Sequence, residues 1–407
     1  MASIADQWLR DIVRILYQRR TLTRSDIVGV TGLNAASVSL ALRHLLRNGT
    51  ILKVGELQSN GGRRREVFTL NGEAAYFVGV DLEGLRLRFA LSNCVGDIRY
   101  RWEEDLEFGQ PLDIGKVVEG IRRVMRELDP IQRERVIAVG VSYPGLLDEE
   151  GRLTAFNLGW RGFPIRDELA AATDLPVFLE PDKHSCVLAE RWLGRAQNSK
   201  SGLFLIIERG IGLGMFLEGK PIGGWHAMAG ELGHCKIDPD APDVCGCGAR
   251  GCLEAIASSP NIVRQYVERA GLSGRAAAEV RVSDVFQRAR QGDAAAQAVV
   301  ERAGNALGLA LSHAVNLLNP EIIVMGGDVL GAEDVLLPVV EASLERNALP
   351  NLTQDLTITM SGLGLDIRLK GAASLAFRKS LEDSSLLKKM CSPLVMRYGP
   401  VAARATR

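Results

Sequence analysis

The residues best suited to chemistry gather in one short stretch, GELGHCKIDPDAPDVCGCGARGCLEA, which begins at Gly230. Four of the chain's seven cysteines lie between residues 235 and 252, together with His234, and Glu231 and Glu254 stand at the two ends. In a chain without an apolar secretory segment, clustered cysteines favour a metal site or thiol chemistry over disulfides. Three interpretations are open: a metal site, a catalytic site, or a crowded loop of free thiols.

Three helices are expected in the first fifty residues. Apolar residues at helical spacing, Ile12 and Leu16 among them, predict the first helix. Thr23 is suited to cap a second helix, and Asn34 to cap a third that ends before Gly49. Two helices joined by a tight glycine turn are typical of the helix-turn-helix, which presents its second helix to DNA.

The two faces of the third helix differ in kind. Four aliphatic residues are expected to face inward: Val38, Leu42, Leu45 and Leu46. Small residues and one cation are left outside, where a major groove would admit them: Ala35, Ser37, Ser39 and Arg43. Two strands follow, and the turn between them carries three arginines: Arg63, Arg64 and Arg65. A basic hairpin there would reach phosphates or the minor groove.

The distribution of charge supports a nucleic-acid partner. Residues 1–72 hold eleven Lys/Arg and five Asp/Glu, a net charge of +6, although the net charge of the whole chain is zero. A basic end on an acidic body indicates a polyanion at that end. A small bundle with a solvated basic loop would contain the same parts. Their order favours a winged helix-turn-helix DNA-binding domain over residues 1–72.

From residue 73 onward the pattern is that of an α/β protein. Apolar runs such as YFVGVD and GLFLII predict buried strands, and helical stretches lie between them. Two hairpins with glycine turns, about 130 residues apart, hint at two similar halves with a cleft between them. We place these halves at residues 73–195 and 196–380. Residues 381–407 form a basic tail that we expect to be flexible.

These motifs together resemble the ROK family of sugar kinases and sugar-responsive repressors, from about residue 5 to residue 380. The family's Glu-x-Gly-His motif is matched by Glu231, Leu232, Gly233 and His234. Its Cys-x-Cys-Gly-x-x-Gly-Cys-x-Glu motif is matched by Cys245, Cys247, Gly248, Gly251, Cys252 and Glu254. The N-terminal winged helix-turn-helix is what the family's repressors, such as xylose and N-acetylglucosamine repressors, add and its kinases lack. The resemblance implies an actin-like ATPase fold of two α/β halves around a cleft.

The resemblance also implies one structural Zn²⁺ ion per chain, and the residue types agree with it. Three thiolates and one imidazole form a closed tetrahedral ligand set: His234, Cys245, Cys247 and Cys252. Because protein atoms fill all four positions, no position remains for an activated water, and we expect no catalytic role for the ion. Cys235 matches no ligand position and is expected to be a small packed thiol.

A sugar in the cleft is the next implication. Glu231, His234 and Glu254 are its expected contacts, since a carboxylate can accept hydrogen bonds from a pair of hydroxyls. The Asn-Asp pair of the family's kinases reads Pro-Asp here, which leaves Asp182 as a further contact or as an ordinary helix cap. The segment AFNLGW resembles another sugar-contacting segment and adds Asn157.

The phosphate-binding loops of the kinases are altered. The family's Asp-x-Gly-Gly-Thr is replaced by Asp81, Leu82, Glu83, Gly84 and Leu85. Glu83 would bring negative charge to a place where the backbone must approach an anion. A second loop keeps glycines at positions 210, 212 and 214, but Glu208 and Arg209 precede it. We therefore expect no useful kinase activity and no catalytic residues.

The expected function is that of a sugar-responsive transcriptional regulator of repressor type. It would bind operator DNA as a homodimer or dimer of dimers, with a monosaccharide or derivative as effector. The alternatives are an ATP-dependent or bifunctional sugar kinase, and a regulator controlled by a protein partner such as a transporter component. Because no apolar run reaches about 18 residues and the N-terminus is amphipathic, we expect a cytoplasmic protein without membrane insertion.

Overall fold

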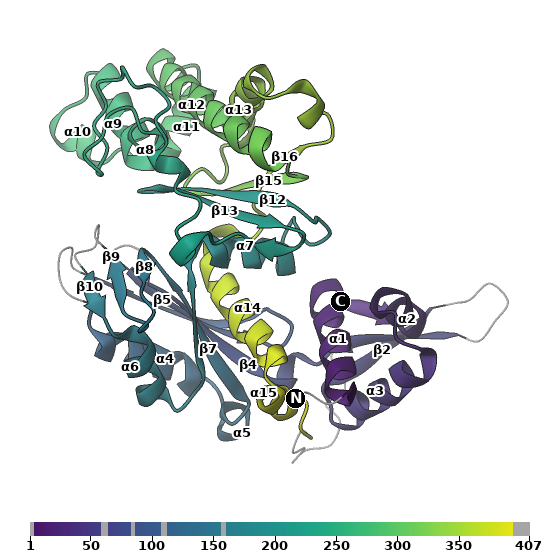
Figure 1. The fold of residues 1–407 in the computed structure, drawn as a ribbon. Helices are drawn as coiled ribbons and strands as arrows, with labels where there is room; N and C mark the ends of the chain where they lie inside the picture. Colours follow the sequence, from purple (N-terminus) through teal and green to yellow (C-terminus); the bar gives the residue numbers. More distant parts are fainter. Residues whose placement is uncertain (1–3, 58–63, 83–85, 107–111, 156–159, 394–407) are drawn as a thin grey trace. The chain divides into compact units, whose positions relative to one another are not determined.

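The computed structural model describes residues 4–57, 64–82, 86–106, 112–155 and 160–393 (Figure 1). The chain divides into two compact units. The first consists of Met1–Pro144, Glu149–Glu180 and Ala372–Arg407, and the second of Gly145–Asp148 and Pro181–Gly371. The division falls at residue 181, earlier than the expected boundary at 196. Each unit contains a five-stranded sheet and several helices, which is the α/β class expected from the sequence.

Residues 4–70 fold as a helix-turn-helix with a small sheet. Its elements are α1 (Ile4–Arg19), β1 (Thr21–Thr23), α2 (Arg24–Thr31), α3 (Ala35–Arg47), β2 (Ile51–Leu57) and β3 (Arg65–Leu70), with strand order β1-β3-β2. Both expected caps form: Thr23 and Asp26 make a reciprocal capping box on α2, and Asn34 accepts the backbone N–H of Ser37 at 2.8 Å on α3. The buried core is aliphatic: Ile12, Leu16, Ile27, Val38, Leu42 and Leu45.

The five-stranded sheet of the first unit has the order β11-β7-β4-β5-β6. Its strands are β4 (Tyr76–Asp81), β5 (Arg86–Asn93), β6 (Ile98–Asp105), β7 (Val136–Tyr143) and β11 (Val177–Pro181). Strand β4 pairs antiparallel with β5 and parallel with β7. Every residue of β4 and β7 is buried, as expected for central strands covered on both faces. Around the sheet lie α4 (Ile114–Arg126), α5 (Pro130–Arg133), α6 (Ile165–Thr173), β9 (Leu153–Ala155) and β10 (Trp160–Phe163).

The sheet of the second unit repeats the same plan, with the order β14-β13-β12-β15-β16. Its strands are β12 (Gly202–Ile207), β13 (Ile211–Leu217), β14 (Lys220–Pro221), β15 (Ile322–Gly327) and β16 (Thr357–Met360). Strand β12 pairs antiparallel with β13 and parallel with β15, just as β4 pairs with β5 and β7. The two glycine-turn hairpins that hinted at two similar halves therefore occupy equivalent positions in two similar sheets, and the expected pair of actin-like α/β halves is confirmed.

The second unit contains seven complete α-helices among the described residues. They are α7 (Asp182–Leu193), α8 (Leu253–Ala257), α9 (Ser259–Arg269), α10 (Gly274–Ala278), α11 (Val282–Arg290), α12 (Ala294–Leu318) and α13 (Glu333–Asn347), and the short strand β8 (Leu146–Leu147) also belongs here. Helix α12 is apolar along most of its length, because α8, α9, α11 and α13 all pack on it. Its side chains join those of the sheet in one large core that includes Val299, Leu307 and Leu311.

The end of the described chain is helical and packs on α1. It consists of α14 (Ile367–Glu382) and α15 (Ser384–Met390). The ring of Phe377 stacks on that of Tyr17 with centroids 4.1 Å apart, and the Asn48 amide donates to the Cys391 carbonyl at 2.8 Å. The expectation of a flexible tail from residue 381 is therefore wrong for residues 384–391, in which Leu387, Met390 and Cys391 are buried. Residues 394–407 lie outside the described part of the chain.

Within the described residues, no single helix is long and apolar enough to cross a membrane. Helices α2 and α3 together would be long and apolar enough, but they are bent by 119° relative to each other. This pair is the helix-turn-helix itself.

Candidate functional site

The cysteine-rich stretch folds as a loop closed by two isolated β-bridges. One bridge pairs Lys236 with Cys252, and the other pairs Val244 with Arg250. Gly251 must be glycine, because its φ is +69° and an added Cβ would lie 1.8 Å from the Asp238 carbonyl oxygen. The two β-bridges bring cysteines that are distant along the loop close together in space.

The four predicted metal ligands are brought together. One ligand atom from each of His234, Cys245, Cys247 and Cys252 lies within 4.8 Å of all the others. The Cys247 and Cys252 sulfurs are 3.8 Å apart, and the Cys245 sulfur lies 3.6 Å from His234 Nδ1. Tetrahedral zinc with Zn–S bonds of about 2.3 Å and Zn–N bonds of about 2.0–2.1 Å requires S···S and S···N separations of about 3.8 and 3.6 Å. The donor set and its spacing therefore fit Zn²⁺.

The thiols differ in their surroundings. The backbone N–H of Ala249 stabilises the thiolate of exposed Cys247 and lowers its pKa to about 7, whereas burial raises the pKa of Cys245 to about 12. Only one of the three thiols is thus readily ionised without a cation. Cys235, which we expected to be packed, is exposed and stands outside the ligand set. Its carbonyl accepts the N–H of Leu253, the residue after Cys252.

Glu254 follows the last cysteine directly and lies against the ligand cluster. One carboxylate oxygen accepts the backbone N–H of Ile211 at 3.2 Å, and the other accepts the Cys245 thiol at 3.6 Å. Because Ile211 begins β13, this carboxylate joins the metal loop to the glycine-turn hairpin. The predicted sugar contact Glu254 therefore lies next to the predicted metal ligands.

Glu231 and Asp182 are linked by a residue that the motif analysis missed. The side chain of Lys183, buried on α7, forms an ion pair with Glu231, whose own side chain is 52% exposed. Asp182 precedes it as the first residue of α7 and accepts the Lys183 N–H at 2.7 Å. Burial raises the pKa of Asp182, and the nearby Arg368 guanidinium acts against this rise. Asn157 lies outside the described residues.

The predicted exposure of the candidate DNA-contacting residues on α3 is observed only in part. Ala35 and Arg43 are exposed, and Ser39 is half-buried with its hydroxyl donating to the Ala35 carbonyl at 2.7 Å. Ser37 was expected outside but is only 7% exposed, because its place next to the Asn34 cap turns it under the first turn of the helix. Leu46 was expected inside but is 38% exposed.

A further apolar residue stands on the exposed side of α3. Leu40 is 54% exposed, in line with the solvent-facing positions rather than with the core stripe. Helical spacing could have indicated this, since position 40 lies two residues from both Val38 and Leu42 and therefore off the core stripe. An exposed aliphatic side chain on a helix of this kind can contact a thymine methyl group.

In the wing, Arg64 and Arg65 are exposed, while Arg63 lies outside the described residues. Arg64 lies 3.8 Å from Glu56 on the neighbouring strand, and Lys53 contacts both Glu56 and Glu66. Acidic partners therefore offset part of the positive charge of the strands.

Comparison with known proteins places these features in a family. The model of the ROK family matches residues 77–379. The chain belongs to the ROK family. A glucokinase of Halalkalibacterium halodurans is 31% identical to this ROK chain over 323 residues, which cover 76% of the chain and 96% of the glucokinase.

Similarity to regulators extends further toward the N-terminus. The DNA-binding transcriptional dual regulator NagC of Escherichia coli K12 is 28% identical over 392 residues, covering 93% of this ROK chain and 94% of NagC. The crystal structure of a ROK family transcriptional regulator, a homolog of the E. coli MLC protein, matches with a TM-score of 0.76 at 28% identity. It covers 95% of this chain and 99% of that one. The extra coverage corresponds to the helix-turn-helix that precedes residue 77.

The loops that meet phosphates in ROK kinases are only partly described here. Asp81 and Leu82 end the first strand, whereas Glu83, Gly84 and Leu85 lie outside the described residues. In the second loop, the Glu208 carboxylate accepts two bonds from the Arg368 guanidinium, at 2.7 and 3.2 Å. Arg368 is almost fully buried. No sequence pattern joins these two residues, which are 160 positions apart, so only the fold could reveal the pair.

Proposed function

We propose that this ROK protein is a sugar-responsive, DNA-binding transcriptional regulator of repressor type. One observation carries the proposal: a fully capped helix-turn-helix with its wing strands precedes the ROK region, and it packs on helices of the same chain. The similarity to regulators extends over this N-terminal part as well as over the ROK region. Phosphoryl transfer to a sugar does not require a helix that enters a DNA groove.

The proposal includes one structural Zn²⁺ ion held by the ligand set His234, Cys245, Cys247 and Cys252. Their spacing fits a closed tetrahedral site. When bound, the ion crosslinks a loop whose own apolar core consists of little more than Cys245, Cys252 and Ala255. The chain's residues do the rest: His234 Nδ1 points to the cluster, and the Ile211 N–H holds the Glu254 carboxylate beside it.

The effector in this proposal is a monosaccharide or a derivative of one. Its contacts are Glu231, His234, Glu254 and Asp182, with Asn157 as a further candidate. Lys183 neutralises Glu231 while one side of that carboxylate stays open to solvent, so the pair can accept one hydroxyl and donate to another oxygen. Asp182, which is half-buried at the start of α7, can accept a hydroxyl through its carboxylate.

Helix α14 supplies a route from the effector site to the DNA-binding helices. In the second unit its Gly371 approaches α7, the helix of Asp182, so closely that a Cβ would lie 2.0 Å from the Ser185 carbonyl oxygen. In the first unit its Ser374 hydroxyl lies 3.1 Å from the Tyr17 hydroxyl of α1. A shift of α7 on effector binding would thus reach α1 through one continuous helix. Such coupling is reciprocal and typically changes affinity about 5–150-fold.

DNA binding is assigned to α3 and the wing. Ala35, Ser39 and Arg43 are the groove-facing candidates, with Leu40 added from the structure, and the wing arginines 63–65 contact phosphates. Ser37 is not proposed to contact a base, because it is buried. A homodimer with two such helices would bind a pseudo-palindromic operator whose half-sites lie about one helical turn, or a multiple of it, apart.

The test is a titration of the full chain against DNA from upstream of its own coding region, by fluorescence anisotropy, with and without a panel of monosaccharides and their phosphates. The proposal predicts sequence-specific binding that at least one sugar alters. Arg43→Ala should weaken binding to that DNA, while Arg275→Ala, on the exposed α10 of the second unit, should not. DNA binding that no sugar changes would contradict the proposed sugar effector. The absence of sequence-specific DNA binding would contradict the proposed regulator.

A weak sugar kinase is the second candidate, favoured by the similarity to a glucokinase and by the retained Asp182. Against it stands the Glu208–Arg368 ion pair, which places a carboxylate in the second glycine loop. A coupled assay with ATP, Mg²⁺ and the same sugars separates the two functions. Sustained turnover abolished by Asp182→Asn would establish the kinase, and turnover at background level would leave the regulator alone.

A further inference from the structure

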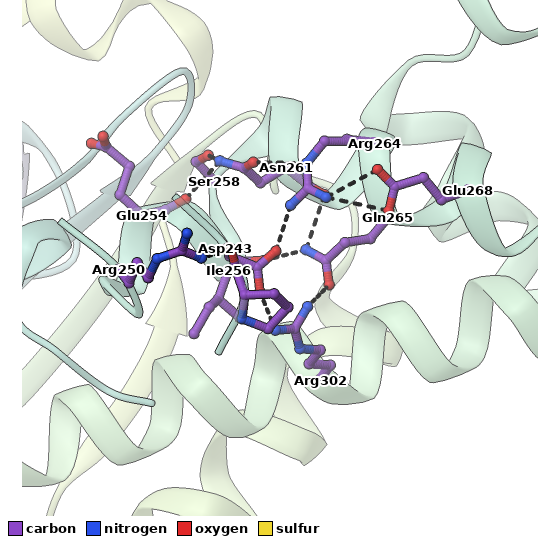
Figure 2. Close-up of polar contacts among 11 residues, drawn as sticks. Asp243, Arg250, Glu254, Ile256, Ser258, Asn261, Arg264, Gln265, Glu268 and Arg302 are labelled. Carbon is purple, nitrogen blue, oxygen red and sulfur yellow. Dashed lines mark hydrogen bonds and ion pairs between the residues drawn. The ribbon is translucent and has the colours of Figure 1, made fainter. Parts of the chain in front are cut away.

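A buried carboxylate stands at the entrance of the metal loop, outside the ligand set. Asp243 lies two residues before Cys245, and its side chain is 5% exposed. One of its oxygens accepts from Arg264 at 2.6 Å, and the other accepts from Arg302 at 2.5 Å (Figure 2). Each oxygen thus has its own guanidinium, and the two arginines come from different helices, α9 and α12.

The same residue holds both strands of the loop together. The Asp243 carbonyl accepts the N–H of Gly251 at 3.1 Å, and the Arg250 guanidinium donates to the neighbouring Pro242 carbonyl at 3.0 Å. Cys245 and Cys247 lie in the segment between these contacts, and Cys252 follows immediately. The side chain of Asp243 therefore attaches the loop to α9 and α12. Its backbone closes the loop at the same residue.

The helices that hold Asp243 also hold the segment after the last cysteine. Asn261 of α9 donates to the Glu254 carbonyl at 3.0 Å, and Gln265 donates to the Ile256 carbonyl at 2.7 Å. Arg302 donates to Gln265 as well as to Asp243 (Figure 2). One polar network consequently anchors the metal loop on its entry side and α8 on its exit side, with the cysteines between the two anchors.

We propose that Asp243 is a positioning residue for the metal centre, whose bonds to Arg264 and Arg302 hold the loop near its ligand geometry before a metal ion binds. The inference rests on the Zn²⁺ site of the proposed function. A loop ordered in advance loses less conformational entropy when it binds, so its affinity for the ion is higher. Groups that hydrogen-bond to metal ligands and orient them typically contribute about 10–100-fold to metal affinity, and this sets the scale expected for Asp243.

The test compares full-length wild-type protein with Asp243→Asn, which keeps the shape of the side chain and removes its charge. Each protein is stripped of metal and titrated with Zn²⁺ against a competing chelator, and Co²⁺ spectra report the geometry. Asp243→Asn should raise the Kd for Zn²⁺ about 10–100-fold. The tetrahedral Co²⁺ bands should persist, because all four ligands remain.

The matched control is Asp334→Asn. It removes an ion pair with similar contact distances, 2.6–2.7 Å, between Arg290 of α11 and Asp334 of α13 in the same unit. This pair is more exposed than that of Asp243 and does not involve the metal loop. Its Kd for Zn²⁺ should equal that of the wild type. Melting with and without Zn²⁺ separates positioning from general stabilisation. Asp243→Asn should reduce the gain in Tm that the ion gives, whereas a merely structural role would lower both Tm values equally.

Should Asp243→Asn not fold, Arg264→Gln at the partly exposed end of the network takes its place, with a smaller expected loss of Zn²⁺ affinity. Arg264→Gln and Asp243→Asn should also be non-additive when combined, since they remove one interaction. Wild-type Zn²⁺ affinity in these variants would overturn the inference while leaving the metal site intact. Wild-type protein that binds no stoichiometric Zn²⁺ would instead overturn the metal site.

Discussion

The metal loop and the helix-turn-helix are positioned by opposite means. The helix-turn-helix has an aliphatic core and capped helices, so its shape follows from burial and local backbone preferences. The loop around Cys245 has almost no apolar core and is held by thiols, by the Asp243 ion pairs and by backbone bridges. The first region should therefore respond to changes in packing, and the second to changes in charge and metal content.

Metal removal should give the largest effect, and it should affect the metal loop without affecting the helix-turn-helix. Structural Zn²⁺ binds zinc-finger peptides with an apparent free energy of about 10–16 kcal/mol, and this free energy stabilises their folded state. We expect chelation, or Cys252→Ser, to lower the protection of residues 236–252 in amide hydrogen exchange, with the contacts of Asp243 retaining part of it, and to remove the sugar response. Protection of α1 and α3 should stay unchanged. Equal loss of protection in both regions would show that they form one cooperative unit.

Leu42→Ala is the converse experiment, with the next largest effect. Leu42 is fully buried in the core of the helix-turn-helix, and a leucine truncated there typically costs about 2–5 kcal/mol. The opening free energy of α1 and α3 by hydrogen exchange should fall by that amount, and DNA binding should weaken, while zinc stoichiometry remains at one. Leu40→Ala, two residues away and exposed, is the control, since it should alter DNA affinity without altering stability. Loss of zinc in Leu42→Ala would contradict the division.

The two regions also differ in how far the sequence predicted them. Helical spacing and cap residues gave the helices and their ends correctly, because both depend on neighbours along the chain. Errors came where one residue's burial depends on tertiary detail, as for Ser37 and Leu46. The ligand set was found through motif resemblance, and its spacing in the structure agrees with that interpretation.

Residues that act at long range stayed hidden in the sequence. Asp243 reaches Arg302 across 59 positions, and Glu208 reaches Arg368 across 160. No period or motif connects charged residues at such separations, so nothing in the chain distinguished these from solvated surface charges. The packing of α14 and α15 on α1 was missed for the same reason, and a basic composition was read as a flexible tail.

Gly371→Ala tests the connection between the two regions. A Cβ there would meet the Ser185 carbonyl oxygen at 2.0 Å, so α7 and α14 must move apart. We expect the sugar and the operator each to bind within a few-fold of wild type, but the effect of one on the other, about 1–3 kcal/mol in comparable systems, should shrink toward zero. Gly362→Ala is the control, because its added Cβ would meet Arg195 at an ordinary 3.7 Å. Undiminished coupling in Gly371→Ala would exclude α14 as the route.

Thr23→Ala should give the smallest effect, and it tests whether local caps contribute separately from the core. The Thr23 hydroxyl accepts the N–H of Asp26, and the Asp26 carboxylate accepts the N–H of Thr23 at 2.9 Å. Loss of such a cap costs about 1 kcal/mol, so the opening free energy of α2 should fall by that amount. Thr23→Ser keeps the hydroxyl and should match the wild type. The same hydroxyl lowers the pKa of Asp26, so the cap's contribution is present above the ordinary aspartate pKa and lost as pH falls through the lowered one. If Thr23→Ala lowered the opening free energy of α2 no more at neutral pH than in acid, the cap would make no separate contribution. Burial alone would then position this helix.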